Sequence, residues 1–189
     1  MPGLSIIIPT HKRAAILTQC LQYIKQQTIA NDLEVIVVSD GHDPQTAALF
    51  AENAKRNHQV PIRFFEIPKS QQGVARNRGV QEADAELCLF IGDDLFLKSD
   101  ACEKHLAMHS KYRMQNAEYK MAVLGFTTWD PELDITPFMR WLERSGWQFG
   151  YPMIAKHAHD FLPKDIQHRF TYTSQISLAT EVAKAHPFR

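Results

Sequence analysis

Four mostly apolar segments constrain the fold of this 189-residue chain more than any other feature. They read "LSIIIP", "LEVIVVSD", "IRFFEI" and "ELCLFI", and their apolar runs differ from the alternating pattern of a strand with one face in water. Residues 14–27, 44–55 and 71–83 separate them and read as helices. Strands covered on both faces, in β-α-β-α order, predict an α/β fold with a doubly wound, mainly parallel sheet.

The rest of the chain has weaker local signals. Asp43 and Pro44 suit the N-cap and the first position of the second predicted helix. Later in the chain, further helices are predicted over residues 100–112 and 136–144, and further strands over 121–129 and 170–179. The last residues, "AHPFR", predict no terminal helix.

Polar residues at the ends of the predicted strands indicate a ligand site. The first strand runs into "PTHKR", the second into Asp40, and the fourth into Asp93 and Asp94, while the helix opened by "QQGVARNRG" carries Arg76. Doubly wound sheets bind ligands at the carboxyl ends of their strands. Adjacent carboxylates repel each other, and an oxygen-only site of this kind suits Mg²⁺ or Mn²⁺ with phosphate oxygens. The alternative is a solvated acidic turn.

Asp93 and Asp94 are expected to have different roles. Successive side chains on an extended backbone point in opposite directions, so one carboxylate would bind the metal ion. The other would accept a hydrogen bond from a ligand hydroxyl or from backbone N–H groups.

Composition excludes some classes of function. Lys plus Arg equals Asp plus Glu, with 21 of each, which gives no overall attraction to nucleic acid or to an anionic membrane. The three cysteines lie in apolar segments without CxxC spacing, which predicts buried free thiols in a reducing compartment. The opening "MPGLSIIIPT" lacks a basic region and is too short to span a bilayer. A cytoplasmic location is expected, either free or at the cytosolic face of a membrane.

Four motifs in order resemble those of the family 2 glycosyltransferases, which have the GT-A fold. They are "SIIIPTHKR", "VIVVSDGHDPQT", "GVARNRGVQEA" and "LCLFIGDDLFL", and the resemblance covers nearly the whole chain. It implies one GT-A domain over 1–189, with a nucleotide-binding half over 1–98 and the start of an acceptor-side half over 99–189. It also implies a metal-dependent, inverting transfer of a sugar from a nucleotide diphosphate, most often UDP, to a saccharide or lipid-linked acceptor.

The resemblance assigns donor-site roles to six residues: Pro9 and Thr10 at the base and ribose, Asp40 at the nucleobase, Arg76 at the base or diphosphate, Asp93 at the ribose, and Asp94 at the metal ion, Mn²⁺ or Mg²⁺. The alternatives are a turn or cap residue for Asp40 and an ordinary surface cation for Arg76. The family's acidic motif is often Asp-x-Asp, and Gly92 stands at its first position here. Metal binding therefore depends on Asp94.

The catalytic base is the gap in this interpretation. Relatives place the base in a Glu-Asp pair beyond the segment "YTSQISL", and no such pair follows here before residue 189. Within that segment, the family more often has asparagine at the position of Gln175. Asp130 is a weak substitute. The chain is therefore expected to be part of a longer transferase or a short protein without full activity. The rivals are a non-catalytic nucleotide-sugar-binding module and a nucleotidyltransferase, although the Gly-rich loop of the latter is absent after the first strand.

Two further sequence patterns can be interpreted as structural or as functional. His105 and His109 are four residues apart on a predicted helix, a spacing that suits metal ligands, but we expect ordinary structural or surface histidines. The aromatic stretch "ITPFMRWLERSGWQFGY" is expected to pack in the core, with a sugar-stacking platform or membrane contact as alternatives.

Overall fold

The computed structural model describes residues 1–53, 59–115, 121–157 and 161–189. The end of the second predicted helix, at Lys55, lies outside the described residues.

The chain forms two compact units. Unit 1 comprises Met1–Val123 and Thr173–Arg189, and unit 2 comprises Leu124–Tyr172. These units are defined by packing. The predicted nucleotide-binding half, 1–98, and acceptor-side half, 99–189, are defined by function, and that division remains a prediction.

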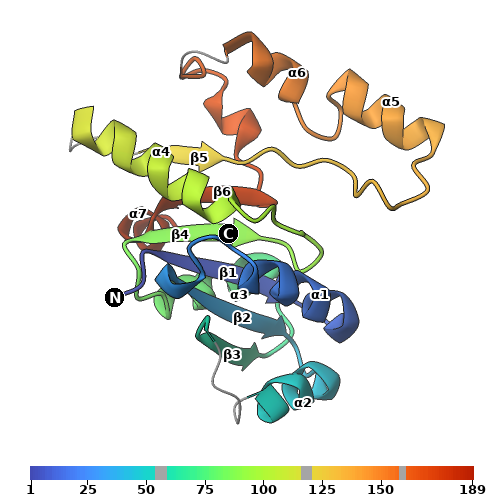
Figure 1. The fold of residues 1–189 in the computed structure, drawn as a ribbon, viewed down its shortest axis with the longest axis vertical. Helices are drawn as coiled ribbons and strands as arrows, with labels where there is room; N and C mark the ends of the chain where they lie inside the picture. Colours follow the sequence, from blue (N-terminus) through green and yellow to red (C-terminus); the bar gives the residue numbers. More distant parts are fainter. Residues whose placement is uncertain (54–58, 116–120, 158–160) are drawn as a thin grey trace. The chain divides into compact units, whose positions relative to one another are not determined.

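A six-stranded sheet has the order β3-β2-β1-β4-β6-β5 (Figure 1). Its strands are β1 Leu4–Thr10, β2 Leu33–Asp40, β3 Ile62–Ile67, β4 Leu87–Ile91, β5 Ala122–Leu124 and β6 Gln175–Ala179. β1 pairs in parallel with β2 and β4, and β2 pairs in parallel with β3, whereas β6 runs antiparallel to β4. The predicted α/β fold with a mainly parallel sheet is confirmed.

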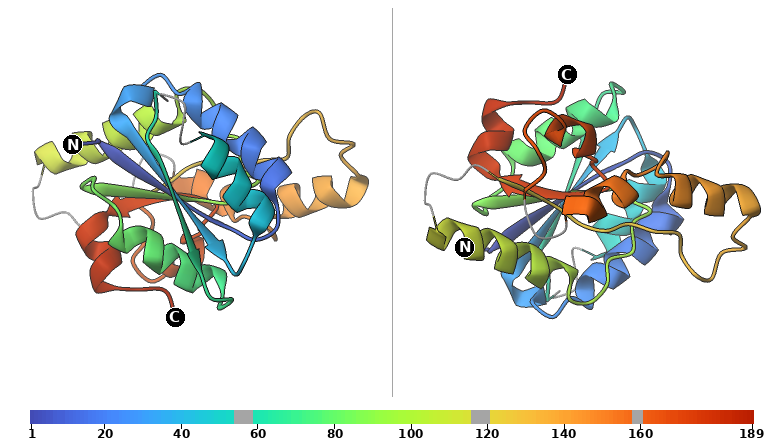
Figure 2. Two further views of the ribbon diagram at one scale, coloured as in Figure 1. Left: turned by 90° about the horizontal axis from the view of Figure 1, so that it is seen from below. Right: turned by 90° about the horizontal axis from the view of Figure 1, so that it is seen from above.

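Helices cover both faces of the sheet. The helices are α1 Ala14–Lys25, α2 Pro44–Asn53, α3 Gln72–Gln81, α4 Ala101–Gln115, α5 Pro137–Ser145, α6 Tyr151–Ile154 and α7 Thr180–Ala185, with short 3-10 turns η1 Ala30–Asp32, η2 Ala155–His157 and η3 Gln167–Phe170. α1 and α4 lie against one face, and α3 and α7 lie against the other (Figure 2). The doubly wound arrangement follows from this layering.

The central strands are buried on both faces, as their sequences require. Every residue of β1 and β2 is buried. Ile6 and Ile8 pack in the cluster that includes Leu17 and Cys20 of α1, while Ile7 points to the opposite face, toward α3. A Cβ at Gly79 of α3 would lie 2.6 Å from Ile7 Cγ2, so the close packing of this helix on β1 requires glycine.

The later elements depart from the prediction. The predicted strand over 121–129 is limited to Ala122–Leu124, and the one over 170–179 to Gln175–Ala179. The expectation of no terminal helix was wrong, because α7 forms at Thr180–Ala185. Its first residue is fixed by remote groups: the Thr180 N–H donates to the Glu86 carbonyl at 2.8 Å. Tertiary contacts of this kind stabilise a helix too short to form alone.

Other local expectations are confirmed. Asp43 caps α2, because its Oδ1 accepts the Thr46 N–H at 3.2 Å. All three cysteines are free and buried. Among the described residues, no helix combines the length and apolar composition needed to cross a bilayer.

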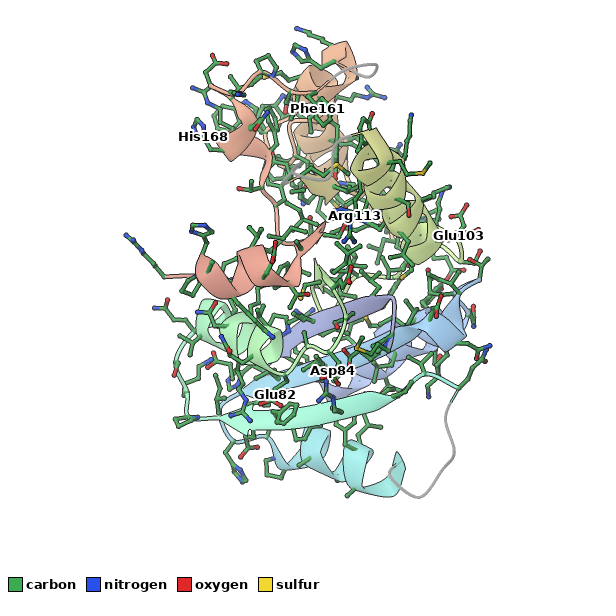
Figure 3. All side chains as sticks on the ribbon, turned by 90° about the vertical axis from the view of Figure 1, so that its left-hand side faces the viewer. Glu82, Asp84, Glu103, Arg113, Phe161 and His168 are labelled. Carbon is green, nitrogen blue, oxygen red and sulfur yellow. The ribbon has the colours of Figure 1, made fainter. Side chains whose placement is uncertain are left out.

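A buried ionic network ties the amino-terminal edge of the sheet together. Glu34 is 5% exposed and accepts the Ser5 hydroxyl at 2.5 Å, the Asp84 N–H at 2.8 Å and Arg63 Nη2 at 2.7 Å. Arg63 also donates to the Glu82 carbonyl and to Asp84, two residues that follow α3 in the chain and are labelled in Figure 3. This network joins the starts of three strands at the edge opposite the predicted ligand site.

Candidate functional site

The strands β1 and β4 separate toward their carboxyl ends, at the point where the strand order of the sheet reverses. β1 pairs with β4 only from Ser5 to Ile7, whereas its pairing with β2 continues to Thr10. Pro9, which has no backbone N–H, lies in the stretch without a β4 partner. From β1 the chain proceeds to β2 and β3 on one side and later to β4 on the other. This change of strand order is the position at which α/β sheets hold ligands.

A cavity of about 680 Å³ lies at these strand ends. That volume is within the roughly 300–1,000 Å³ of small-molecule sites. The lining residues come from four strand ends, the start of α3 and the segment before β6: Pro9, Thr10, His11, Arg13, Asp40, Lys69, Ser70, Gln71, Gln72, Arg76, Gly92, Asp93, Asp94, Leu95, Thr173 and Ser174. All six residues predicted for the donor and the metal line this one cavity, while their individual roles remain predictions.

Asp93 and Asp94 have different surroundings. Asp93 is buried and accepts the Thr10 hydroxyl at 2.8 Å, while the Asp94 side chain is 55% exposed. Arg13 spans the pair: Nη1 lies 2.9 Å from Asp93 Oδ1, and Nη2 lies 2.9 Å from Asp94 Oδ2. Burial raises the pKa of Asp93, although the Thr10 hydrogen bond and the Arg13 charge oppose that rise. The two carboxylates are therefore suited to different tasks.

Gly92 makes room for the exposed carboxylate. A Cβ at this position would lie 2.7 Å from Asp94 Oδ1. Any other residue would push the Asp94 side chain out of its present position. Because this oxygen is the end of a flexible, exposed side chain, glycine favours the present position of Asp94 without being required by it.

Asp40 is held by the segment that follows β3. Its Oδ2 accepts Lys69 Nζ at 2.8 Å, and its Oδ1 accepts the Ser70 N–H at 2.7 Å. Burial opposes ionisation, but the lysine and the N–H outweigh it and hold the pKa of Asp40 below its usual value. Asp40 is therefore an ionised, oriented hydrogen-bond acceptor at the cavity wall.

Arg76 is a buried cation without a carboxylate partner among the described residues. It is 6% exposed, its Nε has no hydrogen-bond partner, and Nη2 donates to Gln72 Oε1 at 3.1 Å. Its guanidinium carbon lies 5.7 Å from the centre of the Phe188 ring. Burial lowers the pKa of Arg76. An arginine left in this state beside a cavity is suited to binding an anionic ligand.

Unpaired polar atoms gather at the cavity. Among the described residues, four buried side-chain polar atoms lack a partner, and three of these, His11 Nδ1, Arg76 Nε and Ser174 Oγ, belong to residues that line it. The fourth, Thr127 Oγ1, lies in unit 2. Because buried polar groups are normally satisfied, this concentration points to a polar ligand.

Sequence reasoning missed several lining residues. Arg13 belongs to the "PTHKR" motif but received no role, and Lys69 and Ser70 follow β3, whose end was not considered. The strand-end rule, applied to β3 as well, would have found Lys69 and Ser70. Ser174 precedes β6, a strand that runs antiparallel, so no local signal marked it.

The other candidate residues lie elsewhere. Asp130 belongs to unit 2, where its Oδ1 accepts the Glu132 N–H at 3.0 Å within a local turn. His105 Nδ1 and His109 Nε2 both contact Ser177 Oγ, at 2.7 and 2.8 Å. These contacts give the two histidines a structural role between α4 and β6.

A metal ion at this cavity would have few protein ligands. Within the described part of the chain, no three His, Cys, Asp or Glu side chains form a group able to hold a metal ion. Mg²⁺ and Mn²⁺ suit such a site, since they bind through one or two carboxylates together with substrate phosphates and water. The exposed Asp94 carboxylate at the cavity fits such an ion.

Comparison with known families identifies the lineage. Residues 5–163 match the family described as Glycosyl transferase family 2. The chain belongs to this family. The resemblance drawn from the four sequence motifs is confirmed.

Curated relatives are glycosyltransferases of bacteria. A PGL/p-HBAD biosynthesis glycosyltransferase of Mycobacterium bovis is 32% identical over 142 residues, which are 71% of this chain and 53% of that protein. A GalNAc(5)-diNAcBac-PP-undecaprenol beta-1,3-glucosyltransferase of Campylobacter jejuni is 32% identical over 101 residues, 53% of this chain and 32% of that protein. The chain thus spans about half or less of these relatives.

Solved structures confirm the predicted GT-A fold. S. aureus TarS in complex with UDP-GlcNAc gives a TM-score of 0.55 at 19% identity, over 70% of this chain and 36% of that one. The mannosyltransferase PcManGT from Pyrobaculum calidifontis, in complex with GDP-Man and Mn²⁺, gives 0.54 at 21% identity, over 67% and 36%.

Proposed function

We propose that this family 2 glycosyltransferase chain binds a nucleoside diphosphate sugar, with UDP as the nucleotide, and serves its metal-dependent, inverting transfer to an acceptor hydroxyl. One observation carries the proposal: a single cavity brings together Asp40, Arg76, Asp93 and Asp94. It thus offers an acceptor for a base, a buried cation for phosphate, and a pair of carboxylates for a ribose and a metal ion. The UDP-GlcNAc complex of TarS and the GDP-Man and Mn²⁺ complex of PcManGT support this ligand class.

Each protein group has a defined task in this proposal. Asp40, fixed by Lys69 and Ser70, accepts a hydrogen bond from the nucleobase. Pro9 and Thr10 border the base and ribose, and Thr10 also orients Asp93 toward the ribose hydroxyls. Arg76 donates to the diphosphate, where its unpaired Nε and its charge are both used.

Asp94 is the proposed metal ligand, with Mn²⁺ or Mg²⁺ as the ion. A bound divalent cation neutralises charge that develops on the leaving diphosphate. Asp94 suits this task because its side chain is exposed at the cavity while Asp93 is already engaged by Thr10. Proton removal from the acceptor needs a separate base. By resemblance we assign it to a Glu-Asp pair beyond residue 189, with Asp130 as the weaker candidate.

The acceptor and the location follow from weaker signals. A saccharide or lipid-linked saccharide is the proposed acceptor, in line with the undecaprenol-linked substrate named for the Campylobacter jejuni relative. We place the protein in the cytosol, free or at the membrane face, because its three cysteines are buried and unpaired.

Calorimetry with UDP, GDP, dTDP and UMP, each with and without Mn²⁺, tests the donor site. We expect UDP to bind more tightly than UMP, and only when Mn²⁺ is present, because a metal on Asp94 bridges two phosphates. Asp94→Asn should abolish the metal effect, while Asp93→Asn should weaken binding less. Equal affinity for UMP and UDP in Mn²⁺ would count against the bridging role, and loss of the metal effect only in Asp93→Asn would reverse the two assignments.

Turnover separates the transferase from a non-catalytic binding module. The assay incubates the full-length protein, which carries any base beyond residue 189, with UDP-sugars and a panel of saccharide acceptors. Mass spectrometry then identifies a product that is one sugar larger than the acceptor. Tight UDP binding without any such product would favour the binding module.

A further inference from the structure

Arg13 occupies the charged end of the cavity in a manner that the proposed function leaves unexplained. It stands at the N-cap of α1, and its guanidinium bridges two carboxylates that follow β4. The Nη1 contact with Asp93 and the Nη2 contact with Asp94 are both 2.9 Å long. One cation thus offsets half of the negative charge at the position proposed for a divalent ion.

The two contacts differ in kind and in exposure: Nη2 donates a hydrogen bond to Asp94, whereas the contact with Asp93 is an ion pair. Asp93 is buried and is also held by Thr10, so its contact with Arg13 is partly shielded from water. Asp94 has no other polar partner among the described residues, and its side chain is 55% exposed, against 47% for Arg13. Exposed pairs of this kind are weak. Because it is open to solvent, the Asp94 contact is therefore the one that an incoming cation can reach and replace.

We propose that Arg13 is a built-in counter-cation that a divalent metal ion displaces from Asp94 when the donor binds. This inference rests on the proposed function. Nη1 keeps Arg13 on Asp93, and the released Nη2 group, still at the cavity wall, donates to a phosphate oxygen of the donor. A guanidinium has five N–H donors in a planar fork, so it can hold a carboxylate and a phosphate together.

This exchange makes metal binding and donor binding cooperative. Without a donor, the metal must break the Arg13–Asp94 contact with no replacement, so Arg13 weakens metal binding. With a diphosphate present, Arg13 gains a new partner, and the cost of displacement is recovered. By linkage, each ligand then tightens the other by the same factor. Arg13 thereby lowers the affinity for the metal ion until a donor is bound.

Electron paramagnetic resonance of free Mn²⁺ tests the proposal without any turnover. The protein is titrated with Mn²⁺ alone and then with Mn²⁺ plus UDP. Arg13→Gln should bind Mn²⁺ alone about two- to five-fold more tightly than the native chain, as expected for loss of an exposed ion pair. The factor by which UDP tightens Mn²⁺ binding should shrink. Arg13→Lys, which keeps the charge but lacks the fork, should lie between the two.

Lys69→Gln is the matched control. It removes one positive charge from the same cavity, but Lys69 pairs with Asp40 and not with the acidic pair. Its affinity for Mn²⁺ alone should change less than that of Arg13→Gln, because only Arg13 contacts Asp94. Circular dichroism of each variant verifies that the fold is retained, and Arg13→Lys provides the second reading if Arg13→Gln folds poorly.

The outcomes separate this proposal from the proposed function. Unchanged or weaker Mn²⁺ binding in Arg13→Gln, with native binding still dependent on Asp94, would overturn the displacement role of Arg13 alone. Equal tightening by Lys69→Gln would also overturn it, because a general charge effect would then suffice. If Asp94→Asn binds Mn²⁺ as the native chain does, or if no variant binds it, the metal site in the proposed function fails as well.

Discussion

Replacing Arg76 with methionine should stabilise the ligand-free protein and weaken donor binding. Arg76 is 6% exposed, its Nε has no partner, and no carboxylate pairs with it within the described ranges. Removing an unsatisfied buried cation recovers about 2–4 kcal/mol of desolvation cost. Methionine keeps the packing of the unbranched stem of the arginine side chain and removes the guanidinium. The native chain thus carries a local instability that a ligand can relieve.

The favourable interactions that Arg76→Met removes are worth less than this gain. The hydrogen bond to Gln72 contributes about 0.5–1.5 kcal/mol, and the contact with the Phe188 ring about 0.5–1 kcal/mol. From the middle of each range, the net change in the free energy of unfolding is a gain of about 1 kcal/mol. At about 2–4 °C per kcal/mol for a chain of this size, the melting temperature should rise by about 2–4 °C.

Donor binding should change in the opposite direction. A charge-assisted hydrogen bond to phosphate is worth about 1.5–3 kcal/mol, so UDP affinity in Mn²⁺ should fall by about 10- to 150-fold. Urea unfolding without ligand and calorimetry with UDP measure the two effects. Arg78→Met is the matched control on the same helix, because Arg78 is exposed and pairs with Glu82 at 2.9 Å. It should change stability by less than about 1 kcal/mol and leave UDP affinity unchanged.

Two results for Arg76→Met would refute the reasoning: a loss of stability, or an unchanged affinity for UDP. If Arg76→Met destabilises the protein by about 1 kcal/mol or more, the buried guanidinium has a partner that the structure does not show. If UDP affinity matches that of Arg78→Met, Arg76 is not a phosphate ligand, and the role carried over from the family is wrong.

Two further predictions concern stability. Glu34→Ala should lower the free energy of unfolding by about 2–4 kcal/mol, because it leaves the buried Ser5 hydroxyl and the Asp84 N–H without their acceptor and removes one of the two carboxylates that pair with Arg63. Glu86→Ala, an exposed change, should cost under about 1 kcal/mol in the same urea titration, and equal losses would contradict the network. Burial lowers the pKa of His105 to about 4. His105 is therefore protonated near pH 6.5 in the unfolded chain but stays neutral in the folded chain down to about pH 4. The free energy of unfolding should consequently fall as the pH drops from about 6.5 to 4. Urea titrations across this range should show a steeper fall for the native chain than for His105→Met; parallel curves would rule out this histidine as the cause.

Much of the framework could be predicted because its signals are local. The order of strands and helices through β4 follows from apolar runs, and Asp43 caps α2 as its residue type predicts. Sequence also predicted which side chains stand at strand ends, and a parallel sheet brings those ends to one edge. For this reason Pro9, Thr10, Asp40, Arg76, Asp93 and Asp94 could be expected in one cavity before their positions were known.

The weaker predictions fail where a segment depends on distant partners. The helix α7 has only six residues, and its start is fixed by carbonyl groups of residues 85 and 86, nearly a hundred positions earlier in the chain. The aromatic helix α5 was expected to pack in the core, yet it has no buried residue. Its periodicity shows an apolar face but does not specify what that face meets.

By itself, the sequence determined the fold class, the family and six of the residues that line the cavity. The tertiary structure decided how their charges are paired: Arg13 with Asp93 and Asp94, Lys69 with Asp40, and Arg76 with no carboxylate in the described part of the chain. Arg13 and Asp94 are 81 positions apart and meet because β1 and β4 lie side by side while their ends separate. A pattern of residue types predicts that charges converge on an edge, but only the three-dimensional positions of their atoms determine which of them neutralise one another.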